Sequence, residues 1–142
     1  MAERARPRML LVDDAAIFRD SLKDALCARF PGVEVLEAGS VAEGYRCVKE
    51  HQPRLVLLDV SLPDGNGLAL ARRIRDELPE VVVCICTLHD EPEYRQAAAE
   101  SGAACFICKQ GDVWNETEHL VSAAFEGANG DRGRGWDTAL RH

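Results

Sequence analysis

The sequence predicts an α/β fold built on one open, parallel β-sheet with helices on both faces. Two observations support this prediction. Short apolar runs, typical of buried strands, alternate with longer segments in which apolar residues recur at helical spacing. Five such strand–helix repeats follow one another with short connections. Repeats of this kind favour parallel strands whose two faces are both covered by helices.

The five predicted strands are short and predominantly apolar. They cover residues 8–13, 33–37, 54–59, 81–86 and 104–108. The third strand contains Leu55-Val56-Leu57-Leu58, which presents apolar side chains to both faces of the sheet, and we expect it at the centre. The Pro-Asp-Gly-Asn-Gly sequence at residues 63–67 predicts a turn after this strand.

The helices between the strands are predicted from apolar periodicity and from start and stop signals. They cover residues 16–30, 41–50, 67–77, 91–101 and 112–125. In the first helix, the apolar stripe consists of Ile17, Phe18, Leu22, Ala25, Leu26 and Phe30. Pro31-Gly32 ends this helix, and Ser40 with Glu43 forms a capping box at the start of the second. Gly102 ends the fourth helix, and Asp112 begins the fifth.

Residues 7–126 are predicted to form a single domain. The chain has 142 residues, of which 46% are hydrophobic and 29% charged, and this composition suits one domain with one adequate core. Residues 1–6 and 127–142 are predicted to be flexible. In the second of these segments apolar periodicity is absent, and four glycines fall between positions 127 and 135.

The composition also bears on location and on partners. No apolar stretch approaches the roughly 18 residues of a membrane span, and no secretory signal is evident, so we expect a cytoplasmic protein without membrane contact. The formal net charge of −7 argues against direct binding of nucleic acid by this chain.

Four of the six cysteines lie inside predicted strands, Cys84 and Cys86 in one and Cys105 and Cys108 in another. Paired metal or redox cysteines more often lie in turns or at helix starts. We therefore expect these four to be small, buried core residues with free thiols.

Polar side chains stand at the carboxyl ends of four predicted strands. Asp13 and Asp14 end the first, Asp59 the third, Thr87 follows the fourth, and Lys109 follows the fifth. Because ligands of open parallel sheets bind beyond the carboxyl ends of the strands, we expect these side chains to form one site. Three carboxylates and one amine leave an excess of negative charge, which a hard divalent cation such as Mg²⁺ would neutralise.

This set of groups suits phosphoryl transfer to a carboxylate. A metal ion and Lys109 could neutralise the phosphoryl oxygens, and Thr87 could donate a hydrogen bond to one of them. Asp59 is the best candidate for the acceptor because it stands alone on the predicted central strand, whereas Asp13 and Asp14 form an adjacent pair suited to the metal. Each residue also has a structural alternative. Asp13, Asp14 or Thr87 could cap a helix, Asp59 could be a turn acid, and Lys109 could be a surface residue near a helix start.

The sequence resembles the receiver domain of two-component response regulators over about residues 7–126. The motifs that carry the resemblance are Val12-Asp13-Asp14-(x)₃-Phe18-Arg19, Leu58-Asp59-(x)₃-Pro63-(x)₂-Asn66-Gly67, Thr87, and Gly102-Ala103-(x)₂-Phe106-(x)₂-Lys109. It is most similar to the receivers of helix-turn-helix transcription regulators, because Gln110 rather than proline follows Lys109.

The resemblance implies a flavodoxin-like (βα)₅ three-layer sandwich with strand order 2-1-3-4-5. It implies that Asp59 accepts a phosphoryl group from a sensor histidine kinase or a phosphotransfer protein. Mg²⁺ would be bound by Asp13, Asp14, Asp59 and the carbonyl of Ser61. The resemblance describes a phospho-acceptor domain rather than an enzyme, with at most self-phosphorylation and self-dephosphorylation.

Further implications of the resemblance concern signal output. Thr87 and Phe106 would form the switch pair, and the output face would comprise residues 91–101, 104–108 and 112–125. The output could be a downstream protein, a homodimer, or a DNA-binding effector domain from which this receiver has been excised. Leu88 departs from the small residue usual at its position.

Three other functions compete with this interpretation. A metal-dependent phosphatase would carry its nucleophile on the first strand in an Asp-x-Asp motif, whereas Asp13 and Asp14 are adjacent. A flavin- or nucleotide-binding domain would need a Gly- or Ser/Thr-rich loop after that strand, where two acids would repel a phosphate. A degenerate receiver acting without phosphate would not need the intact set of site residues.

Overall fold

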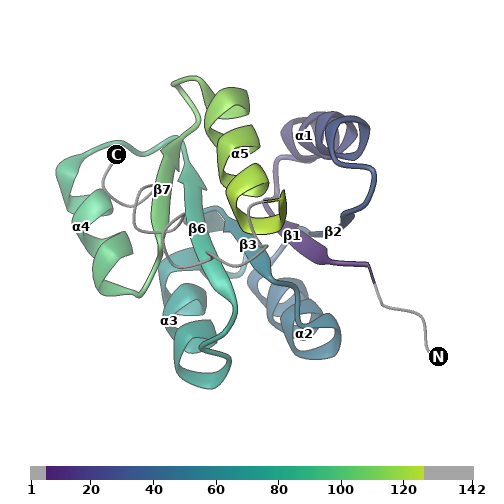
Figure 1. Ribbon diagram of the computed structural model, residues 1–142. Coiled ribbons are helices and arrows are strands. Elements are labelled where there is room, and N and C mark those ends of the chain that lie inside the picture. Colours follow the sequence, from purple (N-terminus) through teal and green to yellow (C-terminus); the bar gives the residue numbers. More distant parts are fainter. Residues whose placement is uncertain (1–5, 127–142) are drawn as a thin grey trace.

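The protein is an α/β sandwich with a five-stranded parallel sheet, described here for residues 6–126 of a computed structural model (Figure 1). The sheet consists of β1 (Arg8–Val12), β2 (Glu34–Ala38), β3 (Leu55–Leu58), β6 (Val82–Thr87) and β7 (Cys105–Cys108). The strand order is β2-β1-β3-β6-β7, and every neighbouring pair is parallel. Counting the strands of this sheet along the chain, the order is the predicted 2-1-3-4-5, so the predicted fold is confirmed.

Helices cover both faces of the sheet. They are α1 (Ala16–Arg29), α2 (Val41–His51), α3 (Gly67–Glu77), α4 (Pro92–Glu100) and α5 (Val113–Val121), which continues as the short π-helix η1 (Ser122–Glu126). In Figure 1, α1 and α5 lie on one side of the sheet and α2 and α3 on the other. Side chains of α1 and α5 pack into one core cluster, and those of α2, α3 and α4 pack into a second. The sheet therefore separates two apolar cores.

The helix boundaries follow the local signals in the sequence. The Ser40 hydroxyl accepts a hydrogen bond from the Glu43 backbone N–H at 3.1 Å, while the Glu43 carboxylate accepts one from the Gly39 N–H at 2.7 Å. Gly102 follows α4 with a φ of +96°, a left-handed conformation that favours glycine. These contacts satisfy backbone groups that a helix end leaves unpaired.

The turn after β3 contains more structure than expected. Residues 61–66 form a small antiparallel hairpin from β4 (Ser61–Leu62) and β5 (Gly65–Asn66). At its tip, the two carboxylate oxygens of Asp64 accept hydrogen bonds from the Val41 and Ala42 N–H groups at 2.7 and 3.0 Å. The hairpin is therefore attached to the first turn of α2.

Two expectations about individual side chains were wrong. Ile17 was placed on the buried stripe of the first helix, but it is 85% exposed, because it lies in the first turn of α1, which extends beyond the core. Cys84 and Cys105 were expected to be free core thiols, but they form a disulfide with a Cα–Cα distance of 4.7 Å. They are direct partners in the register of β6 and β7, a pairing that their separation of 21 residues conceals in the sequence.

Arg6 is the first described residue of the chain, and its side chain contacts the loop before β2. The predicted flexible segments, apart from Arg6, lie outside the described residues. The Arg6 guanidinium donates hydrogen bonds to the Pro31 and Val33 carbonyls, both at 3.2 Å. Within residues 6–126, no helix has both the length and the apolar character that crossing a bilayer requires.

Candidate functional site

The carboxyl ends of four strands, β1, β3, β6 and β7, bring predicted site residues to one edge of the sheet. Asp13 follows β1, Asp59 stands directly after β3, Thr87 is the last residue of β6, and Lys109 directly follows β7. The backbone ladder continues through three of them. The Asp13, Asp59 and Lys109 N–H groups donate to carbonyls of neighbouring strands at 3.0, 3.0 and 2.8 Å. These side chains therefore start from rigid backbone rather than from loops.

Lys109 lies between two of the carboxylates. Its Nζ is 2.6 Å from Asp13 Oδ2 and 3.1 Å from Asp59 Oδ2. The three side chains are only 7–10% exposed, so the ion pairs are largely shielded from solvent. The ammonium also lies 4.4 Å from the centroid of the Phe18 ring, an arrangement that favours a cation. The alternative in which Lys109 is a surface residue is therefore wrong.

Asp13, Asp14 and Asp59 form a cluster that could hold a metal ion. Each offers a carboxylate oxygen, and the three oxygens lie within 4.8 Å of one another. Asp13 and Asp59 are buried, and Asp14 is exposed, so the cluster opens to solvent on one side. The donors are all hard oxygen atoms, which suit Mg²⁺ better than a soft metal, and Lys109 neutralises only part of their charge.

Burial and ion pairing have opposite effects on the pKa values of Asp13 and Lys109. Burial raises the pKa of Asp13, and this effect outweighs the hydrogen bonds from Lys109 and from the Ala15 N–H. For Lys109, burial disfavours the charged form, but the hydrogen bond to Asp13 and the attraction of both carboxylates outweigh it and raise its pKa. Carrying a buried negative charge at Asp13 is therefore costly for the protein without a further cation.

The alternative in which Asp13 or Thr87 caps a helix is also excluded. Asp13 Oδ1 accepts a hydrogen bond from the Ala15 N–H at 2.9 Å, but the N-cap residue of α1 is Ala15 itself, without a side-chain cap. The N-cap residue of α4 is Glu91, four positions beyond Thr87. Neither Asp13 nor Thr87 is thus a helix cap.

Thr87 is connected to α4 through the next loop. Its hydroxyl is buried and accepts a hydrogen bond from the His89 N–H at 3.4 Å. His89 Nε2 lies 3.3 Å from the Ser61 hydroxyl, and the His89 ring stacks on Tyr94 with a centroid distance of 4.5 Å. The intervening Leu88 is 56% exposed. His89 therefore links the β4 hairpin, Thr87 and the first turn of α4.

Arg19 contacts the backbone of a site acid, Asp13, a role that its position in the sequence did not reveal. Its guanidinium donates a hydrogen bond to the Asp13 backbone carbonyl, and its Nε lies 2.8 Å from Glu37 Oε1. Glu37 also pairs with Lys23 at 3.1 Å. The hydrogen bond from Arg19 is the main cause that lowers the pKa of Glu37. Glu37 thus holds the guanidinium that contacts the backbone of a site acid.

We expect Glu37→Gln to lower the unfolding free energy by about 1 kcal/mol at neutral pH, because it removes a half-buried ion pair. A lowered pKa means that the ionised form stabilises the fold above the ordinary value of 4.5 and that this contribution disappears as the pH falls below it. The difference between wild type and variant in urea titrations should therefore shrink with acidification. Glu80→Gln, at an exposed position, is the control, and an equally large pH-dependent difference there would contradict the assignment.

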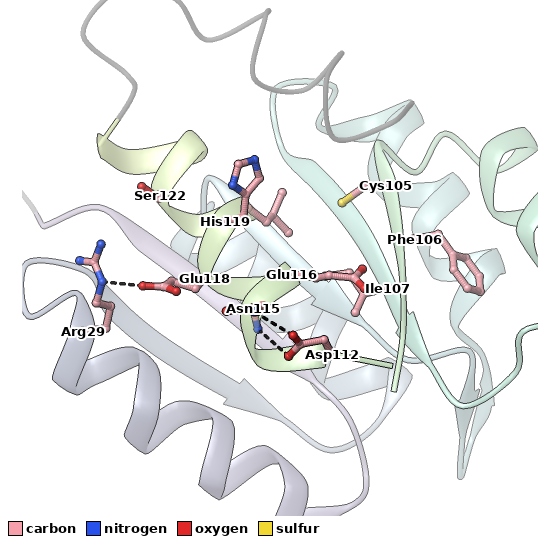
Figure 2. A pocket seen from close by; sticks show the side chains of 11 residues that line it. Arg29, Cys105, Phe106, Ile107, Asp112, Asn115, Glu116, Glu118, His119 and Ser122 are labelled. Atoms are coloured by element: carbon pink, nitrogen blue, oxygen red, sulfur yellow. Dashed lines mark hydrogen bonds and ion pairs between the residues drawn. The ribbon is translucent and has the colours of Figure 1, made fainter. Parts of the chain in front are cut away.

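Phe106, the other predicted switch residue, lies in the middle of β7 rather than at the end of a strand. Cys105 and Ile107 point from β7 toward α5, whereas the Phe106 ring points to the other side of the strand (Figure 2). The ring is half-buried and packs at the margin of the core cluster formed with α2, α3 and α4. Successive side chains of a β-strand point to opposite faces, so the Phe106 ring points away from the face that Ile107 occupies.

A groove with a volume of about 680 Å³ lies along β7 and α5 (Figure 2). Its lining includes Phe106, Asn115, His119 and Leu120, but none of the three acids of the cluster. The groove and the acidic cluster are thus separate features.

The chain matches the family model described as "Response regulator receiver domain" over residues 9–121. It is 34% identical over 124 residues to the transcriptional regulatory protein MctR of Rhizobium johnstonii, covering 87% of this chain and 56% of that protein. It is 38% identical over 103 residues to the DNA-binding transcriptional activator DevR/DosR of Mycobacterium tuberculosis, covering 72% of this chain and 47% of that protein. The chain therefore spans about half the length of the curated relatives it matches.

Solved structures show the same fold. A two-component response regulator of the LuxR family from Aurantimonas sp. aligns with a TM-score of 0.76 at 29% identity, covering 94% of this chain and 97% of that one. A CheY-like response regulator receiver domain protein from Methanospirillum hungatei aligns with a TM-score of 0.76 at 27% identity, covering 86% of this chain and 96% of that one.

Proposed function

Because this chain belongs to the response regulator receiver domain family of two-component systems, we propose that Asp59 is its phosphoryl acceptor. The observation that carries the proposal is the place of Asp59 at the end of the central strand, paired with Lys109 and within reach of two further acids. Contacts within the described residues engage both carboxylate oxygens of Asp13, with Ala15 and Lys109, but only Oδ2 of Asp59. Asp59 is thus a better nucleophile than Asp13.

The remaining site residues would bind Mg²⁺ and stabilise the negative charge of the phosphoryl oxygens. Asp13, Asp14 and Asp59, with the Ser61 carbonyl, would hold Mg²⁺, whose charge would offset that of the phosphoryl oxygens. Lys109 already contacts Asp59 and would remain beside the phosphoryl group as a second positive charge. Thr87 would exchange its hydrogen bond with the His89 N–H for one to a phosphoryl oxygen.

The phosphoryl group adds about two negative charges at the sheet edge, and Thr87 and Phe106 would convert them into a change of surface. Movement of the Thr87 hydroxyl would leave space behind it for the Phe106 ring. The output face would consist of α4, β7 and α5, where the groove along β7 and α5 already offers a partly apolar surface. This proposal describes a regulatory domain rather than an enzyme acting on other substrates.

The partners follow from the family and not from this chain alone. We propose that a sensor histidine kinase or a phosphotransfer protein donates the phosphoryl group. Relatives such as the DNA-binding activator DevR/DosR are about twice as long as the match, so a DNA-binding effector domain joined to this receiver is one output. A separate downstream protein or a homodimer is the other, and a cytoplasmic location suits both.

Incubation with acetyl phosphate and Mg²⁺ is expected to add one phosphoryl group to the protein, as measured by intact-mass spectrometry. The same incubation with excess EDTA should leave the mass unchanged, because the excess carboxylate charge at the site then repels the phosphoryl donor. Labelling that persists without divalent ions would contradict the proposed role of the acidic cluster. Labelling at several sites would contradict the assignment of a single acceptor.

A further inference from the structure

The guanidinium of Arg95 lies over the face of the half-buried Phe106 ring. The Cζ atom of Arg95, in the first half of α4, lies 4.5 Å from the centroid of this ring. At that distance a cation is attracted to the negative face of an aromatic ring. Because the Phe106 ring points away from α5 (Figure 2), the contact with Arg95 joins α4 to β7 on that side of the strand.

Asp90 fixes the position of this guanidinium. Its Oδ1 accepts from Arg95 Nε at 2.9 Å and lies 2.7 Å from Arg95 Nη2. Asp90 belongs to the loop that connects β6 to α4, three residues after Thr87. Arg95 therefore contacts, at the same time, the loop that follows Thr87 and the ring of Phe106.

We propose that Arg95, anchored by Asp90, holds the Phe106 ring in its outward orientation and so opposes the switch to the activated state. The inference rests on the proposed function, in which Thr87 and Phe106 move together. An inward turn of the ring would remove its face from the guanidinium, so the contact stabilises only the outward state. A contact made in one state alone shifts the equilibrium toward that state. Arg95 and Asp90 are thus positioning residues that set the threshold for activation.

Beryllofluoride with Mg²⁺, a stable mimic of the phosphoryl group, provides the test. Protein labelled with fluorophenylalanine would be titrated and followed by ¹⁹F NMR, and the variant Phe106→Leu would assign one of the four phenylalanine resonances. Arg95→Gln should lower the beryllofluoride concentration at half-saturation about five-fold, the factor expected for a partly exposed cation–π contact. It should also shift the resonance of Phe106 toward its beryllofluoride-bound position before any ligand is added.

Two further variants make the result specific. Asp90→Asn should act in the same direction, and the double variant should show less than the product of the two single effects, because both act through one guanidinium. Arg72→Gln, at an exposed position of α3, removes the same charge elsewhere and should change neither readout. A general loss of stability would alter the melting temperature but would not shift the Phe106 resonance toward its bound position.

The outcomes separate this inference from the proposed function. If beryllofluoride leaves the Phe106 resonance of the wild type unchanged, the proposed switch itself is wrong. If the wild type responds but Arg95→Gln neither shifts the resonance nor lowers the half-saturation concentration, only the role of Arg95 is overturned. The same conclusion follows if Arg95→Gln raises that concentration.

Discussion

Asp59→Asn is expected to abolish labelling by acetyl phosphate. The amide cannot provide the carboxylate oxygen that attacks phosphorus, and it also removes one charge from the acidic cluster. The variant should fold, because asparagine has nearly the same shape and Lys109 keeps its ion pair with Asp13 at 2.6 Å. Intact-mass spectrometry after incubation with acetyl phosphate and Mg²⁺ would measure the labelled fraction, which should fall to the level of an unreacted sample.

The control for this experiment is Asp76→Asn, which changes an exposed carboxylate of α3 and should label like the wild type. Circular dichroism of both variants would show that the fold persists. If Asp59→Asn were labelled as fully as the wild type, the acceptor would be another residue, and peptide mapping of the product would identify it. Loss of labelling in Asp76→Asn as well would show that the effect is not specific to the site.

Gly67→Ala is expected to destabilise the protein strongly, because the added methyl group has no space. A Cβ atom at this position would lie 1.9 Å from the backbone oxygen of Asp59 and 2.9 Å from its carbonyl carbon. Neither atom can move without displacing the end of β3, where the Gly67 N–H also donates to the Val60 carbonyl at 2.7 Å. Overpacking of this kind costs about 3 kcal/mol, or roughly 10 °C in melting temperature for a domain of this size.

The Gly67→Ala substitution should also displace the proposed acceptor, because the backbone carbonyl that meets the new Cβ atom belongs to Asp59 itself. Labelling of Gly67→Ala by acetyl phosphate should therefore be slower even at temperatures where the variant is folded. Gly32→Ala is the matched control, since a Cβ atom there meets nothing within 4 Å. It should melt within a degree or two of the wild type, as expected of a surface change away from any packed contact. Equal melting temperatures for the two variants would show that the close approach at Gly67 has been overstated.

The strands, the helices and the gathering of the site could be predicted because all depend on local patterns, whereas the strand order came from the family resemblance. Buried strands leave short apolar runs such as Leu55–Leu58, and helix ends leave signals such as the Ser40 cap, so the elements can be read one at a time. Once the strands are parallel, their carboxyl ends must share one edge of the sheet. The presence of Asp13, Asp59 and Lys109 at one edge of the sheet then follows from chain direction.

Contacts between particular side chains were not predictable in this way. The pairing of Cys84 with Cys105 depends on the register of β6 against β7, which no local pattern specifies. The exposure of Ile17 depends on how far α1 extends past the edge of the core. The contact of Arg95 with Phe106 needs a long, flexible side chain to reach a neighbouring element, and the sequence gives no sign of where that side chain ends.

The amino-acid sequence was sufficient to predict the fold class, the strand order through a family resemblance, and the identity of the acids and the lysine at the sheet edge. The periodicity of apolar residues and the direction of the strands are sufficient for this, since both are properties of short segments. The tertiary structure alone decided how these groups are used: that Lys109 lies between Asp13 and Asp59, that Arg19 holds the Asp13 backbone, and that Arg95 covers Phe106. Such contacts depend on distances of a few ångströms between distant segments, and only the packed chain fixes those distances.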